Sequence, residues 1–168
     1  MPGQEKAGER ERNPGDRTVA SNRRARHDYA IEETYEAGMV LTGPEVKSLR
    51  AGRATLSDSY ARVDPDGRAV WIENLHIPPY ERADTRRYQP KRARKLLLHQ
   101  GEIERLIGKT AERGLTLVPL KIYFTRGIAK MELGLGRGKR QFEKRQTIAE
   151  REHRREMERG MATRRRES

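Results

Sequence analysis

The sequence predicts a mainly β protein, a small antiparallel β-barrel with about three accessory helices and a flexible basic C-terminal tail. Three observations lead to this prediction. Apolar and polar residues alternate along 29–41, they alternate again along 115–124 and 128–135, and only 33% of the 168 residues are hydrophobic. Alternation with a period of two is typical of strands that bury one face. The low apolar content fits one domain with a modest core.

The first predicted strand runs from Tyr29 to Leu41. Its odd positions are apolar except for Glu33, while polar residues such as Glu36 occupy the alternate face. Gly38 lies inside this pattern and predicts a bulge or a sharp bend. A bend of this kind allows a sheet to curl into a small barrel.

A short helix is expected immediately after this strand. Thr42 and Glu45 have the spacing of a capping box, in which each residue satisfies a free backbone donor at the start of a helix. Lys47 and Arg50 stand three residues apart and give the helix a basic edge. Gly52 is expected to end it.

The middle of the chain predicts a hairpin followed by a loop. Residues 59–63 and 69–77 flank a turn at 64–67 that contains proline and glycine. The loop at 78–90 holds two tyrosines and three arginines. The tyrosines have two interpretations, since they could stack on bases or close over the end of the barrel.

Residues 91–99 begin with basic residues and end with three leucines and a histidine. Leu96 to Leu98 cannot all point inward from one helical turn, so we expect one of them, or His99, to lie on the surface. Apolar residues at 103, 106 and 107 then predict a helix that stops at Gly114.

The two alternating stretches near the end of the body predict a final strand pair. Arg126 and Gly127 join residues 115–124 to residues 128–135 by a tight turn. Pro119 lies in the first of these strands and cannot donate a hydrogen bond to a neighbour. It therefore predicts an edge position or a bulge.

Three regions follow from composition. Residues 1–21 mix glycine, proline and charge, and are expected to be disordered. Residues 22–136 form the β-barrel domain, which begins with a basic cluster at 22–27. Residues 137–168 have no helical apolar stripe, and an isolated polar helix is marginal in water. We expect this tail to be largely disordered alone and helical when bound.

The charge predicts a polyanionic partner. Lysine and arginine total 37 against 25 acidic residues, giving a net charge of +12, which favours nucleic acid. A membrane surface is the alternative, but no apolar run could span a bilayer and the N-terminus lacks a signal-peptide core, so we expect a cytoplasmic protein. Without cysteine, and with four scattered histidines, no metal site or cofactor is expected. No catalytic set can be recognised either.

Several motifs together closely resemble the SsrA-binding proteins, the small protein B family, which bind the transfer-messenger RNA (tmRNA) of bacterial trans-translation. The resemblance runs from about Asn22 to Met161. Its motifs lie at 22–29, 31–33, 35–38, 41–43, 45–52, 57–60, 94–99, 118–121, 138–140 and 144–145.

This resemblance implies an oligonucleotide-binding (OB) barrel whose partner is the tRNA-like domain of tmRNA. It also implies delivery, with elongation factor Tu, to a stalled 70S ribosome for ribosome rescue. The barrel would replace the missing anticodon stem near the decoding centre, and the tail would enter the empty mRNA channel. We expect the protein to act there as a monomer and as a binding factor, without catalysis.

Carried over position by position, the resemblance implies two groups of site residues. The first comprises residues expected to contact RNA: Arg23, Arg26, Glu36, Lys47, Arg50, Lys95, Leu97, His99, Lys130, Lys139 and Arg140. Among them Glu36, Leu97, His99 and Lys130 would face the RNA most directly. The second comprises tail residues expected to contact the ribosome: Phe142, Glu143, Lys144, Arg145, His153 and Met161. The tail departs from the family pattern at 142–143, 153 and 160.

Two other functions stay open from the residues alone. A generic structural protein of the ribosome would share the barrel and the basic tail but would show no preference for tRNA-like RNA. A small RNA-processing nuclease would use His27, Asp28 and Glu45 as its acid and base groups.

Overall fold

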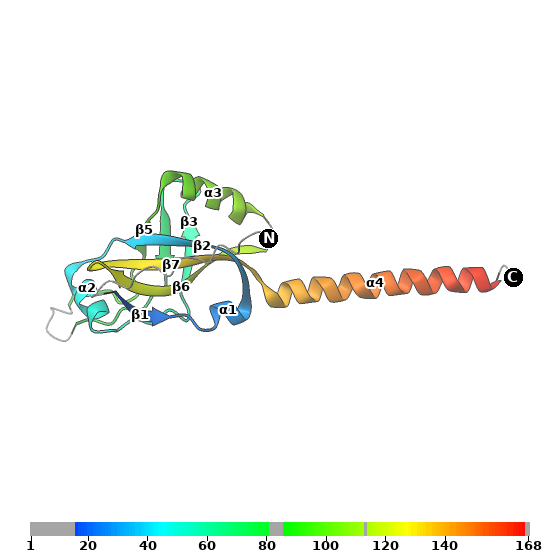
Figure 1. The fold of residues 1–168 in the computed structure, drawn as a ribbon, viewed down its shortest axis with the longest axis horizontal. Helices are drawn as coiled ribbons and strands as arrows, with labels where there is room; N and C mark the ends of the chain where they lie inside the picture. Colours follow the sequence, from blue (N-terminus) through cyan, green and yellow to red (C-terminus); the bar gives the residue numbers. More distant parts are fainter. Residues whose placement is uncertain (1–15, 81–85, 113, 167–168) are drawn as a thin grey trace, which may run out of the picture.

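Seven antiparallel strands form the body of the molecule in the computed structural model, which describes residues 16–80, 86–112 and 114–166 (Figure 1). Their order in the sheet is β1-β6-β7-β2-β5-β4-β3. The strands are β1 Arg17–Ser21, β2 Tyr29–Met39, β3 Tyr60–Val63, β4 Val70–Glu73, β5 Arg94–Leu97, β6 Leu115–Thr125 and β7 Ile128–Gly138. β3 also comes close to β6, so the sheet curls upon itself. The predicted mainly β, OB-like fold is confirmed.

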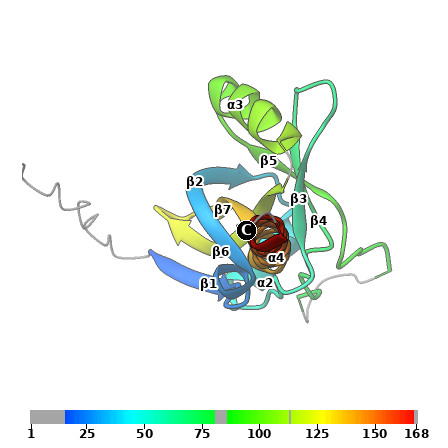
Figure 2. The ribbon, with the colours of Figure 1, turned by 90° about the vertical axis from the view of Figure 1, so that its right-hand side faces the viewer.

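Three helices of the described chain lie on the barrel, as predicted, and a fourth extends away from it (Figure 1). They are α1 Ala25–Asp28, α2 Gly43–Arg50, α3 Gln100–Ala111 and α4 Lys139–Arg166. Figure 2 looks along α4 and shows α3 and α2 at separate places on the barrel. The predicted capping box of α2 is confirmed, since the backbone N–H of Thr42 donates to Glu45 Oε1 at 2.9 Å.

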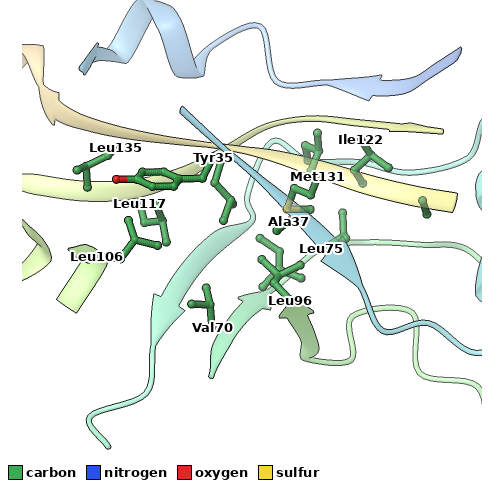
Figure 3. Packing of buried hydrophobic residues seen from close by; sticks show 14 of the residues in the cluster. Tyr35, Ala37, Val70, Leu75, Leu96, Leu106, Leu117, Ile122, Met131 and Leu135 are labelled. Atoms are coloured by element: carbon green, nitrogen blue, oxygen red, sulfur yellow. The ribbon is translucent and has the colours of Figure 1, made fainter. Parts of the chain in front are cut away.

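The apolar core lies inside the curled sheet (Figure 3). The predicted alternation of the first strand is confirmed, because Tyr35 and Ala37 are buried while Glu36 between them is exposed. Leu96 of β5 and Met131 of β7 pack into the same cluster from the two neighbouring strands. A smaller cluster joins α1 to the outside of β6 through buried Ala25, Val118 and Leu120.

One of the two bulge positions predicted from the sequence differs in the structure. Gly38 was predicted to mark a bulge or a sharp bend. It pairs regularly with Leu97 and Lys130, so the bulge is not there, and the register of β2 shifts between Ile31 and Glu33 instead. Gly38 serves a close approach, because a Cβ at this position would lie 3.3 Å from the Cβ of Leu97. The bulge predicted at Pro119 is confirmed, since the register of β6 shifts directly after it.

The three leucines of 91–99 belong to a strand rather than to a helical turn. β5 pairs with both β2 and β4, so its side chains alternate in direction. Leu96 is buried, whereas Leu97 is 53% exposed. The prediction that one of these leucines lies on the surface is confirmed, although the physical reason is strand alternation.

A buried ion pair joins α2 to β5. Arg94 and Glu45 are each almost fully enclosed, and the Arg94 guanidinium donates to the Glu45 carboxylate. Arg92 donates to the other carboxylate oxygen at 2.5 Å. Arg94 also donates to the backbone carbonyls of Leu75 and Pro90, at 2.7 and 3.0 Å. These bonds connect the helix, the strand and the segment that leads into it.

A second polar cluster fixes α3 to β2. The Arg105 side chain donates twice to the Glu33 carboxylate, at 2.5 and 3.2 Å, and the Tyr35 hydroxyl donates to the same group. These bonds, with Arg105 first and Tyr35 second, lower the pKa of Glu33 from 4.5 to about 2. Ile103 and Leu106 are buried on one face of α3, as predicted, whereas Ile107, which was predicted on the same face, is exposed.

Both ends of the barrel domain extend beyond their predicted limits. Arg17–Ser21 form β1, because the edge of β6 offers hydrogen bonds and the core accepts Val19 and Ala20. The disorder predicted for 1–21 is therefore wrong for these five residues, and residues 1–15 lie outside the described part. At the other end β7 runs to Gly138, which is two residues into the segment 137–168 predicted as a tail, and α4 begins at Lys139. The side chains described at 148–163 of α4 are exposed.

Replacing Glu45 with alanine should destabilise the protein strongly, because Arg94 would be left charged and buried without its partner. We expect the free energy of unfolding to fall by about 3–5 kcal/mol. Chemical denaturation would measure it, with Glu104→Ala on the exposed face of α3 as the matched control. Equal denaturation midpoints for the two variants would contradict the role given to the ion pair.

The bonds to Glu33 should make the stability depend on pH in the acid range. The folded pKa lies below the ordinary 4.5, so the stabilisation is fully present above pH 4.5 and is lost as the pH falls to about 2. Glu33→Gln should therefore lower the thermal midpoint at pH 6, and the difference from the wild type should shrink between pH 4.5 and 2. A difference that stays constant over this range would show that charge is not involved.

Candidate nucleic-acid interface

Three of the residues expected to face RNA lie together on the outside of the sheet. Gly38 of β2 pairs with Leu97 of β5 on one side and with Lys130 of β7 on the other. Glu36 lies two residues earlier in β2 and therefore points to the same side. We call the solvent side of β6, β7, β2 and β5 the outer face. The structure thus brings Glu36, Leu97 and Lys130 onto one surface.

Lys95 and His99 lie along the same strand as Leu97. Lys95 is exposed and two residues before it, so it belongs to the outer face, where it stands opposite Trp71 of β4. His99 is exposed at the N-terminus of α3. Its backbone N–H donates to the Glu102 side chain at 3.2 Å, as one half of a capping box at the start of the helix.

The remaining predicted cations border the outer face at two places. Arg26 of α1 reaches toward it, with its guanidinium 4.0 Å from Glu132 of β7. Lys139 donates to the backbone carbonyl of Arg26 at 3.0 Å, so the start of α4 is joined to α1. Lys47 and Arg50 are exposed on α2, beyond the end of β2, and do not lie on the strands of the outer face. Arg23 is exposed just before α1.

The charges on the outer face are arranged in pairs. Glu36 stands directly opposite Glu132, an arrangement of like charges that is unfavourable by itself. Lys121 of β6 compensates Glu132 at 3.4 Å. Glu36 instead accepts a hydrogen bond from the Tyr123 hydroxyl, and the Lys121 ammonium lies 5.2 Å from the centre of the Tyr123 ring.

Tyr123 and Lys121 are site residues that the sequence reasoning missed. The signal was present, because Ile122 and Phe124 were predicted to alternate inward in this strand. Their neighbours must then point outward. Together with Glu36 and Lys130 they line an open hollow that extends along β1, β6, β7 and β2. The sequence could not show that a hollow forms on this side of the sheet.

Most of the tail residues expected to contact the ribosome lie where the structure describes no side chains. Arg140, Phe142, Glu143, Lys144 and Arg145 lie outside the described side chains. His153 and Met161 are exposed on α4, and neither is buried against the barrel. Their expected contacts with the ribosome stay predictions.

The residues proposed for a nuclease do not form one site. His27 Nδ1 lies 3.1 Å from Asp28 Oδ1 on the exposed surface of α1. Glu45 belongs to α2, and its carboxylate is paired with Arg92 and with Arg94 of β5. This carboxylate therefore joins the helix to the sheet. Among the described residues no group of three or more acidic, histidine or cysteine side chains could hold a metal ion. The geometry therefore does not favour hydrolysis by these residues.

The OB-like barrel, with its outer face and its basic borders, defines a class, that of barrel proteins that bind RNA through one side of the sheet. The family model described as SmpB protein matches residues 19–163, and the chain belongs to this family. Within the described residues, none of the helices is both long and apolar enough to span a membrane.

Similar proteins cover nearly the whole chain. An SsrA-binding protein of Acidothermus cellulolyticus is 58% identical over 153 residues, which is 91% of this chain and 95% of that protein. One of Thermobifida fusca is 58% identical over 151 residues, covering 90% and 93%. A solved structure described as tmRNA-SmpB at the centre of the bacterial ribosome contains a chain that is 59% identical. It covers 71% of this chain and 83% of its own, with a TM-score of 0.60.

Leu97→Asp should leave the fold intact, because the side chain is 53% exposed and a carboxylate there stays solvated. We expect a change in thermal midpoint of only a few degrees, corresponding to about 0.5 kcal/mol. The matched control is Leu96→Asp, which places the same carboxylate in the core and should abolish cooperative unfolding. If Leu97→Asp also loses its cooperative transition, Leu97 is a core residue and its assignment to the outer face is wrong.

Proposed function

We propose that this protein binds the tRNA-like domain of tmRNA and brings it to stalled ribosomes for trans-translation. The main observation is that Glu36, Leu97 and Lys130 lie on one surface around Gly38, although they are far apart in the sequence. The similar proteins are named SsrA-binding proteins, and the similar solved structure is described as tmRNA-SmpB in the bacterial ribosome. Both support this assignment.

The chemistry of the outer face suits a folded RNA. Lys95 and Lys130 can neutralise phosphates, which supplies affinity without sequence preference. Leu97 offers an apolar contact, and Glu36 can only accept hydrogen bonds from bases or riboses. A protein that needed only nonspecific RNA binding would gain nothing from an acid in this position. This favours a specific RNA partner over a generic structural role in the ribosome.

The cations on α1 and α2 extend this surface. Arg23 and Arg26 lie at one border, next to the start of α4, and Lys47 and Arg50 lie on the exposed edge of α2. We assign them phosphate contacts, because each is solvent-exposed and long enough to follow an RNA backbone. Lys139 and Arg140 would continue the contact toward the tail.

We further propose that α4 enters the empty mRNA channel. The helix has 28 residues and is therefore about 42 Å long. Its exposed arginines can pair with phosphates, and a helix without an apolar stripe gains stability from such surroundings. Phe142 to Arg145, His153 and Met161 are the residues proposed to contact the ribosome. We also propose that the protein acts as a cytoplasmic monomer, together with elongation factor Tu, and without catalysis of its own.

Sequencing the RNA that copurifies with the protein from bacterial cells tests the central assignment. We expect tmRNA to be enriched far above ribosomal RNA, and affinity for its tRNA-like domain to fall steeply between 50 and 200 mM salt, because counterions are released on binding. A variant with Lys95→Glu and Lys130→Glu should lose this enrichment. Copurification of ribosomal RNA alone, or an affinity that does not change with salt, would contradict the proposal.

Truncation before Phe142 should separate the two parts of the proposed function. Binding of tmRNA should change little, whereas tagging of incomplete peptides on stalled ribosomes should be abolished. The matched control restores the missing residues in scrambled order, with the same composition and charge. If the scrambled tail supports tagging at the wild-type rate, the tail is a nonspecific electrostatic anchor and its role in the channel is wrong.

A further inference from the structure

We propose that the hollow on the outer face is a subsite for one unpaired nucleobase that carries an exocyclic amino group. In this subsite the base stacks on the ring of Tyr123 and donates its amino group to the carboxylate of Glu36. The inference rests on the proposed function and deepens it, since it states which chemical feature of the RNA the face would select.

Tyr123 is held in a fixed position suited to stacking. It points outward between the buried Ile122 and Phe124, so it forms part of the floor of the hollow. Its hydroxyl donates to Glu36, and the Lys121 ammonium lies 5.2 Å from its ring centre. Because these contacts already orient the side chain, stacking a base on it costs little conformational entropy. Base–aromatic stacking is a common source of affinity for single-stranded RNA.

Glu36 supplies the selectivity. Its carboxylate stands opposite Glu132, where it cannot attract a phosphate but can accept a hydrogen bond from a base. An ionised carboxylate has about four acceptor sites, so it can accept hydrogen bonds from more than one donor, as it already does from the Tyr123 hydroxyl. The amino groups of cytosine and guanine are natural donors to such a group. At the position of the cytosine amino group uracil has its O4 acceptor, which the negative charge would repel.

The surroundings of Tyr123 suit the nucleotides on either side of this base. Lys130 stands directly opposite Tyr123 in the pairing of β6 with β7, and Arg126 follows at the turn. Both cations line the hollow, where they can contact the flanking phosphates. Ile128 lies at the rim with 58% of its surface exposed and can cover the edge of the base.

Tyr60 provides an internal comparison. It also lies on a strand, is 50% exposed, and donates through its hydroxyl to a glutamate, Glu73, at 2.9 Å. It does not line the hollow, and Glu73 is bonded to Arg62 at 2.6 Å. A tyrosine–glutamate pair alone therefore does not define the subsite, and Tyr60→Ala is a matched control for Tyr123→Ala.

The test uses the full-length protein and fluorescence anisotropy with three labelled probes: the tRNA-like domain of tmRNA, the hexamer r(C)6 and the hexamer r(U)6. We expect the wild type to bind r(C)6 several-fold more tightly than r(U)6, and Glu36→Gln to lose this preference. Tyr123→Ala should weaken binding of the tRNA-like domain roughly tenfold or more, as expected for one lost stack. Tyr60→Ala should bind it like the wild type. Tyr123→Phe keeps the ring and should lose mainly the preference for r(C)6.

Equal affinity of the wild type for r(C)6 and r(U)6 would overturn the base assignment. If Tyr123→Ala and Tyr60→Ala both bind the tRNA-like domain like the wild type, the hollow is not the subsite, although the proposed function survives. Failure of the wild type to bind the tRNA-like domain would instead refute the proposed function, and the two hexamers would still decide the selectivity of the hollow.

Discussion

The ion pair between Glu45 and Arg94 is the interaction on which the candidate site depends. It is buried, and it connects the start of α2 to the first residue of β5. A charge enclosed in this way is costly without its partner. Arg94 must therefore point inward, and strand alternation then turns Lys95 and Leu97 outward. A shift of β5 by one residue would bury Lys95 and Leu97 and expose Arg94 and Leu96. The same bond that stabilises the barrel thus decides which side chains reach the outer face.

The outer face combines residues from strands that are distant in the sequence. β2 lies between β7 and β5, so Gly38 has Lys130 on one side and Leu97 on the other. The absence of a side chain at Gly38 brings Leu97 close to the sheet, where an added Cβ would lie 3.3 Å away. An acid, an apolar group and several cations therefore share one surface. This mixture suits an RNA that is read through bases or riboses as well as through phosphates.

Much of the fold could be predicted because the long strands carry strong local signals. The alternation along Tyr29–Met39, the capping box of α2 and the turn at Arg126 each depend on neighbouring residues. β1 was missed because its five residues have little apolar character and form a strand only along the edge of β6. β5 was missed because its first inward-pointing residue is the charged Arg94, so its sequence does not show the apolar–polar alternation of a strand. Glu36, Leu97 and Lys130 came from the family resemblance. The alternation of β6 could have placed Tyr123 on the outside, but the hollow that it lines is formed by four strands and is not contained in any local pattern.

We propose above all that RNA binds the outer face rather than another side of the barrel. Lysine-reactive footprinting by mass spectrometry, with and without the tRNA-like domain of tmRNA, tests it most directly. Lys95, Lys121 and Lys130 lie on the strands of the outer face, whereas Lys109 lies near the C-terminal end of α3 and belongs to none of these strands. We predict that RNA protects the first three from modification and leaves Lys109 reactive. Protection of Lys109 with unchanged reactivity at Lys95 and Lys130 would contradict the account.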